Sequence, residues 1–450
     1  MLVMKFGGSS IADAEHIRRV AKIVQERLDK NLVVVLSAMG DTTDFILKAA
    51  DEAITTGPVS VEFSIEKITE LHLNALRELG ISKTLTQDIR ELLSDLASLL
   101  SGVSLIKELT AKTRDYLVSF GERLSARVAA RYFQSLGIKA RALDAWDAGF
   151  ISDSGFGSAE LLEESWRTIP QALLPLIDEG ILPIVTGFIA KDSSGAITTL
   201  GRGGSDLSAT VIAASCNAEE AQVWKDVDGI LTADPRIVKD ARLVRAVTYE
   251  EAAELAFFGA QVLHPRAMQP CSKTGTPVLV KNSYNPQSPG SVISASLPEG
   301  INSVRAITMR GNVTLVDIVS SRMLGQYGFL AELFSCFAQH KISVDMVATS
   351  EVSVSLTLDA AHDIAAVKKT LSRIASVEVK TKKAIVTIIG LVERSSAILE
   401  SAFGVCASLG VQAQMVSQGA SKVNISFIVD HDQAESVVRG LHKRFFERDN

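Results

Sequence analysis

The stretch Leu2–Ser10 (LVMKFGGSS) forms a short apolar strand that ends in two glycines and is followed by a helical pattern. Glycines at a strand end let backbone N–H groups approach an anion closely, and Lys5 adds a positive charge beside them. Taken by itself, the pair Gly7 and Gly8 is equally compatible with a plain strand-to-helix turn. The stretch therefore predicts an α/β fold and marks a first candidate anion site.

More strands of this kind alternate with amphipathic helices over the first ~290 residues, which is typical of a sheet layered by helices. We expect these strands at Leu32–Ser37, Ile181–Phe188, Gln222–Trp224 and Val278–Val280. Residues of about 55–115 carry apolar side chains at helical spacing, without strand-like alternation. The pattern predicts an α/β sandwich with a mostly parallel central sheet over residues 1–293, interrupted by a helical insertion.

After the turn formers Asn285–Gly290 (NPQSPG), the chain contains a weak internal repeat. Each copy reads as strand, helix, hairpin and helix, which is ferredoxin-like in pattern. In the first copy these elements are Val313–Val319, Phe329–His340, Ile342–Leu358 and Ile364–Ile374. In the second they are Ala384–Leu391, Ser396–Leu409, Val411–Val429 and Gln433–Phe445. We place the two units at residues 303–382 and 383–440.

The composition excludes several classes of protein. A chain of 450 residues with 47% hydrophobic and 22% charged residues is typical of globular domains, and about three are expected. The net charge of −6 gives no broad basic field, so nucleic acid is not expected as a partner. The apolar stretches are too short to span a membrane, and no targeting segment is recognised, so the cytoplasm is the expected location. Four scattered cysteines, with no CxxC pair, argue against a zinc ribbon or a disulfide framework.

Two further segments carry polar residues suited to anion chemistry. Thr199–Asp206 (TLGRGGSD) surrounds an arginine with glycines and leads into a helix, where Asp206 could also be a simple N-cap. Trp224–Arg236 packs acids, a glycine and cations into a loop after a strand. Neither a Walker A sequence nor a GxGxxG fingerprint is present, so the two commonest nucleotide motifs are excluded.

Together the motifs resemble those of the aspartate kinases, members of the amino acid kinase family with C-terminal ACT domains. The resemblance rests, in order, on Lys5–Ser10, Val118–Ser125 (VSFGERLS), Gly187–Ile189, Thr199–Asp206, Asp226–Gly229, Ala233–Arg236 and Phe258–Pro265 (FGAQVLHP). It implies an amino-acid-kinase-like sandwich, paired ACT domains, and ATP-dependent phosphorylation of the L-aspartate side chain to 4-phospho-L-aspartate. That reaction opens the route to lysine, threonine and methionine.

The resemblance also implies roles for individual residues. Lys5 and Asp206 would be catalytic, with Asp206 organising the lysines. Aspartate would be bound by Ser37, Thr43, Glu122, Phe188, Arg202, Gly203, Gly204 and Ser205. ATP would be bound by Lys5, Gly7, Gly8, Ser9, Lys225, Asp226, Leu231, Arg236 and Gln261. Gln261 stands where many members have a nucleotide-binding lysine. We hypothesise that Lys225 or Lys281 supplies the positive charge that this lysine would provide.

The reaction needs little beyond alignment and charge neutralisation. A carboxylate of pKa about 3.9 is ionised at neutral pH and requires no general base. Lys5, Arg202 and backbone amides would oppose the repulsion between it and ATP. We expect Mg²⁺ to bind through the nucleotide phosphates, and no metal site made by protein ligands.

The resemblance implies feedback inhibition by L-lysine, with threonine or S-adenosylmethionine as a further candidate effector. The first copy matches the lysine-sensitive pattern at Met323, Gly328, Phe329, Leu330, Asp345, Ser350 and Glu351. The positions of the second copy that align with Asp345 and Glu351 are not acidic, so we expect the first copy to bind the effector. We also expect a homodimer through the ACT domains, which could pair into tetramers, and a first ACT domain completed by residues of about 440–450.

Two alternatives stay open from the sequence. One is a related kinase acting on another acid such as glutamate, which Glu122 and the ACT pair disfavour. The other is an amino-acid-sensing ACT protein with weak or no catalysis, suggested by Gln261 and opposed by Lys5, Arg202 and Asp206.

Overall fold

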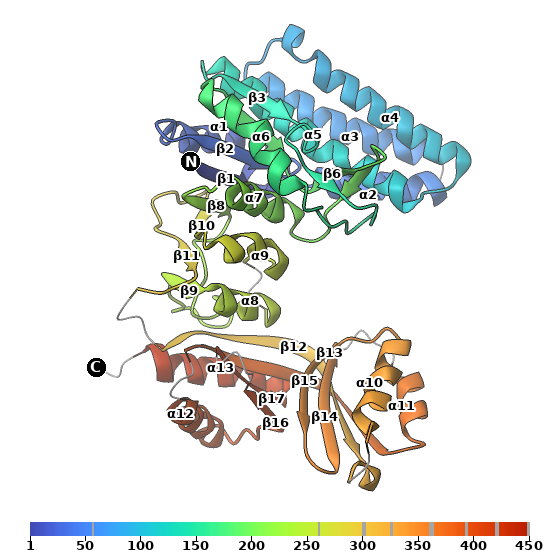
Figure 1. Cartoon of the computed structure of the whole chain (residues 1–450), viewed down its shortest axis with the longest axis vertical. Coiled ribbons are helices and arrows are strands. Elements are labelled where there is room, and N and C mark those ends of the chain that lie inside the picture. Colours follow the sequence, from blue (N-terminus) through green and yellow to red (C-terminus); the bar gives the residue numbers. More distant parts are fainter. Residues whose placement is uncertain are drawn as a thin grey trace. The chain divides into compact units, whose positions relative to one another are not determined.

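The computed structural model divides the chain into two compact units, each described by itself (Figure 1). It describes all residues except 56–57, 260–261, 299–302, 325–326, 360–363, 392–394, 419–422 and 448–450. The N-terminal unit comprises Met1–Ile230, Arg245–Tyr249 and Val262–Leu297. The C-terminal unit comprises Leu231–Val244, Glu250–Gln261 and Pro298–Asn450.

An eight-stranded sheet forms the centre of the N-terminal unit, in the order β3-β5-β2-β1-β8-β10-β11-β9. Its strands are β1 (Leu2–Phe6), β2 (Leu32–Leu36), β3 (Ala140–Leu143), β5 (Leu182–Thr186), β8 (Glu220–Lys225), β9 (Ala246–Thr248), β10 (Val278–Asn282) and β11 (Ser291–Ser294). All neighbouring pairs are parallel except β10 with β11. The expected mostly parallel α/β sheet is confirmed.

Helices layer this sheet because their apolar faces need burial. They are α1 (Ala14–Gln25), α5 (Ala111–Ser135), α6 (Ser165–Asp178), α7 (Gly204–Ser215) and α9 (Pro265–Thr274). A small sheet of β4 (Ile151–Ser152), β6 (Ile189–Asp192) and β7 (Ile197–Thr199) lies beside α5, and β7 contacts that helix. The ends of β1, β2, β5 and β7 and the start of α7 supply the site described below.

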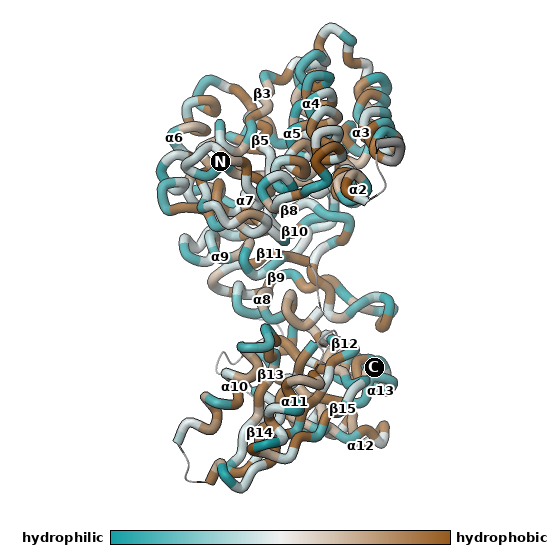
Figure 2. Tube along the Cα trace, turned by 90° about the vertical axis from the view of Figure 1, so that its right-hand side faces the viewer, coloured by the Kyte–Doolittle hydropathy of each residue, from teal (hydrophilic) through white to brown (hydrophobic). Residues whose placement is uncertain are grey.

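The segment expected to be a helical insertion, at residues of about 55–115, contains α3 (Pro58–Glu78), α4 (Gln87–Ile106) and the start of α5, and α2 (Thr42–Thr55) precedes it. Hydrophobic and hydrophilic residues alternate along α3 and α4, as amphipathic helices require (Figure 2). Ile68, Leu76 and Leu96 are buried in the same apolar core as Met4 and Phe6 of β1. The insertion is therefore an integral part of the N-terminal core.

The C-terminal unit contains a six-stranded antiparallel sheet in the order β13-β14-β12-β15-β17-β16. Its strands are β12 (Val304–Val319), β13 (Val344–Thr349), β14 (Ser353–Asp359), β15 (Ser376–Gly390), β16 (Met415–Gln418) and β17 (Asn424–Asp430). Its helices are α10 (Phe329–Gln339), α11 (Ala365–Leu371), α12 (Ser395–Ser408) and α13 (His431–Phe446). The elements follow the repeat expected from the sequence, to within a few residues for the helices.

Two apolar cores divide this sheet between the two copies. Helices α10 and α11 share a core with Val316 and Ile318 in the second half of β12. Helices α12 and α13 share another with Val304 and Ile307 in its first half. Leu441, Phe445 and Phe446 of α13 thus pack with the second copy and the start of β12, whereas the sequence analysis expected residues of about 440–450 to complete the first copy. The long strands β12 and β15 run through both copies.

The packing also redraws the boundary expected at about residue 293. Residues 231–244 and most of α8 (Tyr249–Phe257) belong to the C-terminal unit. Ala233 and Val238 are buried in the core that contains α13. Helix α8 is fixed to the sheet by a buried ion pair between Glu251 and Arg305, whose Oε1 and Nε lie 3.4 Å apart.

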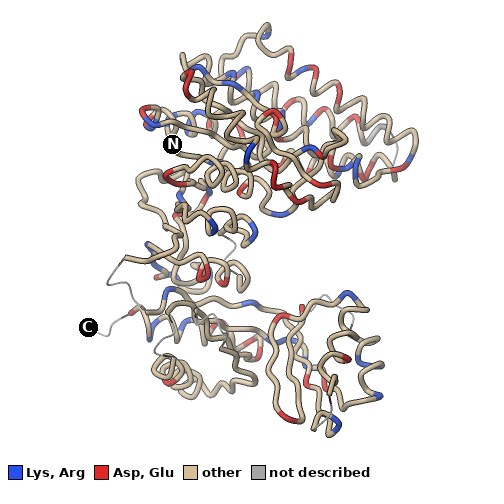
Figure 3. The backbone as a smooth tube through the Cα atoms, viewed as in Figure 1, with Lys and Arg blue, Asp and Glu red and all other residues tan. Residues whose placement is uncertain are grey.

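Within the described residues, no helix is long and apolar enough to cross a membrane. In the same part of the chain, no group of three or more His, Cys, Asp or Glu side chains is arranged to hold a metal ion. Acidic and basic residues are interspersed along the backbone of each unit (Figure 3).

Candidate active site

A cavity of about 500 Å³ opens in the N-terminal unit where several strand ends meet the start of α7. Its lining brings together residues that lie up to 201 positions apart in the sequence, between Lys5 and Asp206. The lining residues are Lys5, Gly8, Ser37, Ala38, Gly40, Thr43, Glu122, Phe188, Gly201, Arg202, Gly203, Gly204, Ser205 and Asp206. All the residues predicted to bind aspartate are among them.

Asp206 lies in the first turn of α7 and bridges two lysines. Its Oδ1 is 2.5 Å from Lys5 Nζ, and its Oδ2 is 3.3 Å from Lys225 Nζ. Burial alone would raise the pKa of Asp206, but the two ammonium groups outweigh this effect and hold its pKa below the ordinary value. The carboxylate therefore stays ionised and fixes two cations at the cavity.

The strand register decides which lysines can face the cavity. Lys5 pairs with Val223 in β8, so Lys225, two residues further on, lies on the same face of the sheet as Lys5. Lys281 pairs with Trp224 and therefore lies on the opposite face. There its Nζ is 5.3 Å from the centroid of the Trp224 ring, and burial together with the nearby Arg27 lowers its pKa.

Glu122, on α5, has a buried side chain in the wall of the cavity. Its Oε1 accepts a hydrogen bond from the Ala38 backbone N–H at 3.2 Å, while its buried Oε2 has no hydrogen-bond partner among the described residues. Burial raises the pKa of Glu122 to about 8, and the hydrogen bonds and the charge of Lys5 only partly oppose this shift. Such a group is prepared for a cationic partner.

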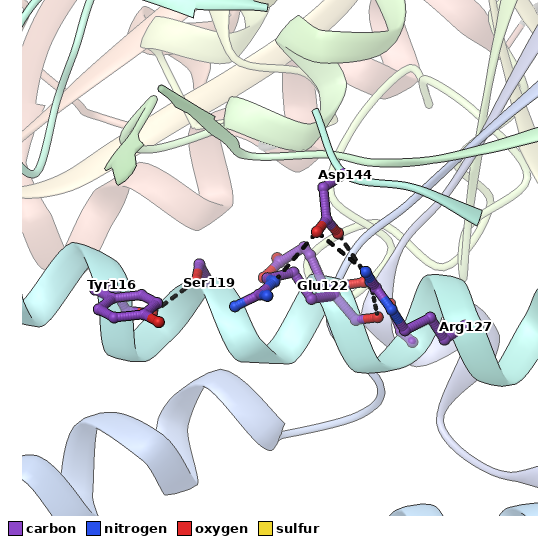
Figure 4. A network of polar contacts seen from close by, with 7 residues as sticks. Tyr116, Ser119, Glu122, Arg127 and Asp144 are labelled. Atoms are coloured by element: carbon purple, nitrogen blue, oxygen red, sulfur yellow. Dashed lines mark hydrogen bonds and ion pairs between the residues drawn. The ribbon is translucent and has the colours of Figure 1, made fainter. Parts of the chain in front are cut away.

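Helix α5 approaches the loop after β2 very closely at this point. A Cβ at Gly121 would come within 2.7 Å of the Ala38 side chain, and Ser125 Oγ donates to the Ser37 carbonyl at 2.6 Å. Any larger residue at position 121 would displace Glu122 from Ala38. Arg127 of the same helix holds a second buried carboxylate, Asp144, which follows β3, at 2.8 Å (Figure 4).

The glycine-rich segment Gly201–Gly204 turns sharply into α7. Gly201 and Gly203 both have φ of +73°, a conformation that glycine adopts without strain. A Cβ at Gly203 would also come within 2.7 Å of His264. The turn leaves Arg202 exposed at the rim of the cavity, where its guanidinium is free to meet a carboxylate or phosphate.

Phe188 closes another part of the cavity wall with a backbone φ of +69°, which is unusual for a residue with a side chain. Its N–H donates to Ser208 Oγ on α7 at 3.1 Å, and its ring packs against Gly204. Strain of this kind persists where the surroundings over-determine the conformation, as they do in functional sites.

The predicted ATP-binding residues are less completely gathered. Lys5 and Gly8 line the cavity, and Lys225 reaches it through Asp206. Gly7 and Ser9 flank Gly8 in the sequence, and Asp226 is exposed beside Lys225. Leu231 and Arg236 belong to the C-terminal unit, where Arg236 pairs with Asp234. Gln261 lies outside the described residues.

Sequence reasoning did not identify the segment that braces the two lysine-bearing strand ends. Ser283 Oγ bonds Ser10 Oγ at 2.8 Å and donates to the Lys225 carbonyl at 3.0 Å. Tyr284 Oη donates to the Ser9 carbonyl at 3.0 Å. Gly40 and Ala38 were also missed, although they directly follow β2.

The predicted effector residues lie in the first copy of the C-terminal unit. Gly328 is the N-cap of α10, and Phe329 and Met323 pack in the core that also holds Val344 of β13. Leu330 and Glu351 are exposed, and Ser350 Oγ bonds Ser353 Oγ in the turn after β13. Asp345 is already engaged by an internal cation, because its Oδ2 lies 3.1 Å from Arg310 Nη1.

Comparisons with known proteins agree with this geometry. The amino acid kinase family model matches residues 1–282, and an ACT domain model matches residues 316–371 and 386–445. Aspartokinase 2, chloroplastic, from Arabidopsis thaliana is 49% identical over 463 residues, covering 99% of this chain and 84% of the relative.

Two solved structures of Escherichia coli aspartokinase III are similar along the whole chain. The complex with aspartate and ADP, in the R-state, has a TM-score of 0.82 and 33% identity. The complex with lysine and aspartate, in the T-state, has a TM-score of 0.81 and 34% identity. Each comparison covers 99% of this chain and 100% of the other.

Proposed function

The chain belongs to the aspartokinases of the amino acid kinase family, and from that premise we propose that it transfers a phosphoryl group from ATP to the side chain of L-aspartate. The observation that carries the proposal is the cavity in which the Lys5–Asp206–Lys225 cluster, Arg202 and Glu122 come together. The relatives of known structure bind aspartate with ADP, or aspartate with lysine. The product is 4-phospho-L-aspartate.

The residues perform this transfer chiefly by alignment. The ionised side-chain carboxylate attacks the γ-phosphorus, and the bond from phosphorus to the ADP oxygen breaks with its electrons leaving on ADP. Glu122 receives the substrate ammonium and Arg202 a substrate carboxylate. Lys5, fixed by Asp206, neutralises charge on the transferring phosphoryl group.

The donor set also fits ATP carrying its own magnesium ion. Such an ion binds through the phosphates and water and needs few protein ligands. Mg²⁺ bound in this way neutralises phosphate charge. The residues of this chain bind and orient the nucleotide through Lys5, Lys225 and the backbone around Gly8.

The first test is ATP- and Mg²⁺-dependent formation of aspartyl hydroxamate, measured with and without L-lysine. We expect aspartate-dependent activity that lysine inhibits. Activity that ignores lysine would retain the kinase and remove the effector site. The absence of turnover in protein that binds lysine would favour an amino-acid sensor.

Lys225, and not Lys281, is the cation we propose for the nucleotide, because only Lys225 shares a sheet face with Lys5. We expect Lys225→Ala to raise the KM for ATP by about tenfold, the effect of losing one charge-assisted contact. Lys281→Ala is the matched control and should leave this KM within about twofold. Equal effects of the two substitutions would contradict the assignment.

L-lysine is the effector we propose for the first ACT copy, with Asp345 receiving its side-chain ammonium. This ammonium must then compete with Arg310, whose Nη1 lies 3.1 Å from Asp345 Oδ2. We expect Asp345→Asn to raise the lysine concentration for half-inhibition by at least about tenfold without changing kcat. Asp359→Asn removes the other carboxylate near Arg310, at 3.2 Å, and serves as the control. Unchanged inhibition in Asp345→Asn would refute this role.

A homodimer through the ACT domains, with pairing into tetramers, fits several apolar side chains exposed in the first copy. They are Val319, Leu324, Tyr327, Leu330, Val347 and Val352. Sedimentation equilibrium with and without lysine measures this assembly.

S-adenosylmethionine and threonine remain proposed co-effectors. A cytoplasmic location is also proposed, and fractionation of the source cells tests it.

A further inference from the structure

Thr199, which lies two residues before the glycine-rich segment, is held by a buried carboxylate on α5. Asp115 Oδ2 accepts from the Thr199 N–H at 2.8 Å, and its Oδ1 accepts from Thr199 Oγ1 at 2.8 Å. Oδ2 also accepts from the Gly157 N–H at 2.8 Å. Asp115 is only 2% exposed, so these three bonds fix Thr199 to the helix in a water-poor environment.

An arginine at the start of α9 holds the next residue. Arg266 Nη1 donates to the Leu200 carbonyl and Nη2 to the Ala159 carbonyl, both at 2.7 Å. The Ala159 N–H in turn donates to the Thr199 carbonyl at 2.8 Å. The planar guanidinium thus joins two backbone segments at the point where the glycine-rich turn begins.

The turn itself needs such support. Gly201 and Gly203 have no side chains to pack and readily adopt several backbone conformations. The placement of Arg202 between them is therefore set by what holds Thr199 and Leu200 in place.

The helix that holds Thr199 also carries Glu122. Asp115 lies seven residues before Glu122, which corresponds to about 10 Å along α5. One rigid helix therefore determines the separation between Glu122, which receives the substrate ammonium, and the segment of Arg202, which receives a substrate carboxylate. Because the ammonium and the α-carboxylate of an amino acid sit on one carbon, the two groups together fix the substrate Cα and therefore how far the side-chain carboxylate reaches.

We propose that Asp115 and Arg266 are positioning residues that set the spacing of Arg202 from Glu122, and so select aspartate over the longer glutamate. The inference rests on the proposed function, because it assumes that Glu122 and Arg202 bind the ammonium and the α-carboxylate of the acceptor. An added methylene moves the side-chain carboxylate out of line with the phosphoryl group only if these two anchors hold the Cα in place.

The test compares kcat and KM for aspartate and glutamate, from the hydroxamate formed, in the full-length protein and its variants. We expect Arg266→Ala to raise the KM for aspartate about tenfold, with the KM for ATP within about twofold. The ratio of kcat/KM for aspartate to that for glutamate should fall by about tenfold. Arg266→Lys should resemble Arg266→Ala, since an ammonium cannot reproduce the fork.

Matched variants separate positioning from folding. Arg131→Ala removes a surface arginine of α5 paired with Asp88, and should leave both KM values unchanged. Asp115→Asn should retain most of the selectivity, because the amide oxygen still accepts from the two N–H groups and the amide nitrogen can donate to Thr199 Oγ1. Melting temperatures identify any variant that fails to fold.

A double-mutant cycle tests whether Arg266 acts through Arg202. In an Arg202→Ala background, Arg266→Ala should add less than about a twofold change in the KM for aspartate. Full additivity, or an unchanged selectivity ratio in folded Arg266→Ala, would overturn the inference while leaving the kinase assignment intact. Wild-type protein that forms no aspartyl hydroxamate would overturn the proposed function, and this inference with it.

Discussion

Asp206→Asn should lower kcat by about 10² to 10³-fold, the range found when a preorganised charge is removed from an active site. The carboxylate holds Lys5 at 2.5 Å and Lys225 at 3.3 Å. The amide keeps the shape but loses the charge, so the two ammonium groups repel each other and leave the cavity. The KM for ATP should rise in the same variant, because both cations serve the phosphates.

Asp144→Asn is the control for that experiment. Asp144 is also a buried carboxylate between two cations, Arg123 at 3.4 Å and Arg127 at 2.8 Å, but it does not line the cavity (Figure 4). Both substitutions should lower the melting temperature, since each leaves buried cations without their counter-charge. Only Asp206→Asn should lose kcat. A comparable loss in both would mean that Asp206 acts through stability alone.

The same cluster predicts how stability depends on acid. The pKa of Asp206 is below its ordinary value in the folded state, so its contribution is present above the unfolded pKa near 3.8 and is lost as the pH falls through the lower, folded value. The carboxylate is thus ionised throughout the range in which activity is measured. An acidic limb in the rate near neutral pH must come from another group.

The sheet could be predicted because its strands give local signals, whereas the residues for aspartate binding came from the resemblance of the motifs to a family. Strand–glycine–helix junctions such as Leu2–Ser10 bring their polar residues to one edge of a parallel sheet, wherever the chain returns to it. All eight residues that the resemblance implied for aspartate line the cavity, although Glu122 lies within helix α5 and not at a strand end.

What could not be predicted depends on register and on long-range packing. Only the pairing of Lys281 with Trp224 shows that Lys281 faces away from Lys5. Similarly, Asp115 and Arg266, which hold Thr199 and Leu200, lie 151 positions apart in the sequence and on different helices. The copy that the last residues complete was predicted wrongly because β12 runs through both copies, and a strand of 16 residues gives no local sign of where one copy ends.

Glu122→Gln should reduce kcat/KM for aspartate by about 10² to 10³-fold, because a buried ammonium–carboxylate pair loses one partner. In the wild type, kcat/KM reports the ionisation of the free enzyme. Since the pKa of Glu122 is about 8, we expect kcat/KM for aspartate to rise with pH up to about 8 and then level off. This rise should vanish in Glu122→Gln, and kcat at saturating aspartate should depend less on pH than kcat/KM does.

The stability of Glu122→Gln should change in the opposite direction to its activity. A folded pKa of about 8 against an ordinary 4.5 means that the buried group favours its neutral form. The contribution of Glu122 to folding stability is complete below its pKa in the unfolded chain. It is lost as the pH rises towards its pKa in the folded protein. The variant does not titrate, so its melting temperature relative to wild type should increase between about pH 5 and pH 8.

Glu254→Gln supplies the matched control for both measurements. Burial also raises the pKa of Glu254, on α8, where its carboxylate accepts from Asn424 at 2.6 Å, far in sequence from the cavity residues of α5. The amide oxygen of the variant can still accept this bond, so activity should keep its wild-type pH profile. A profile for Glu122→Gln that still rises through pH 8 would show that another group governs aspartate binding. A loss of the rise together with a gain in stability would mean that this site keeps a carboxylate at a cost to folding, because only the charged form can hold the substrate ammonium.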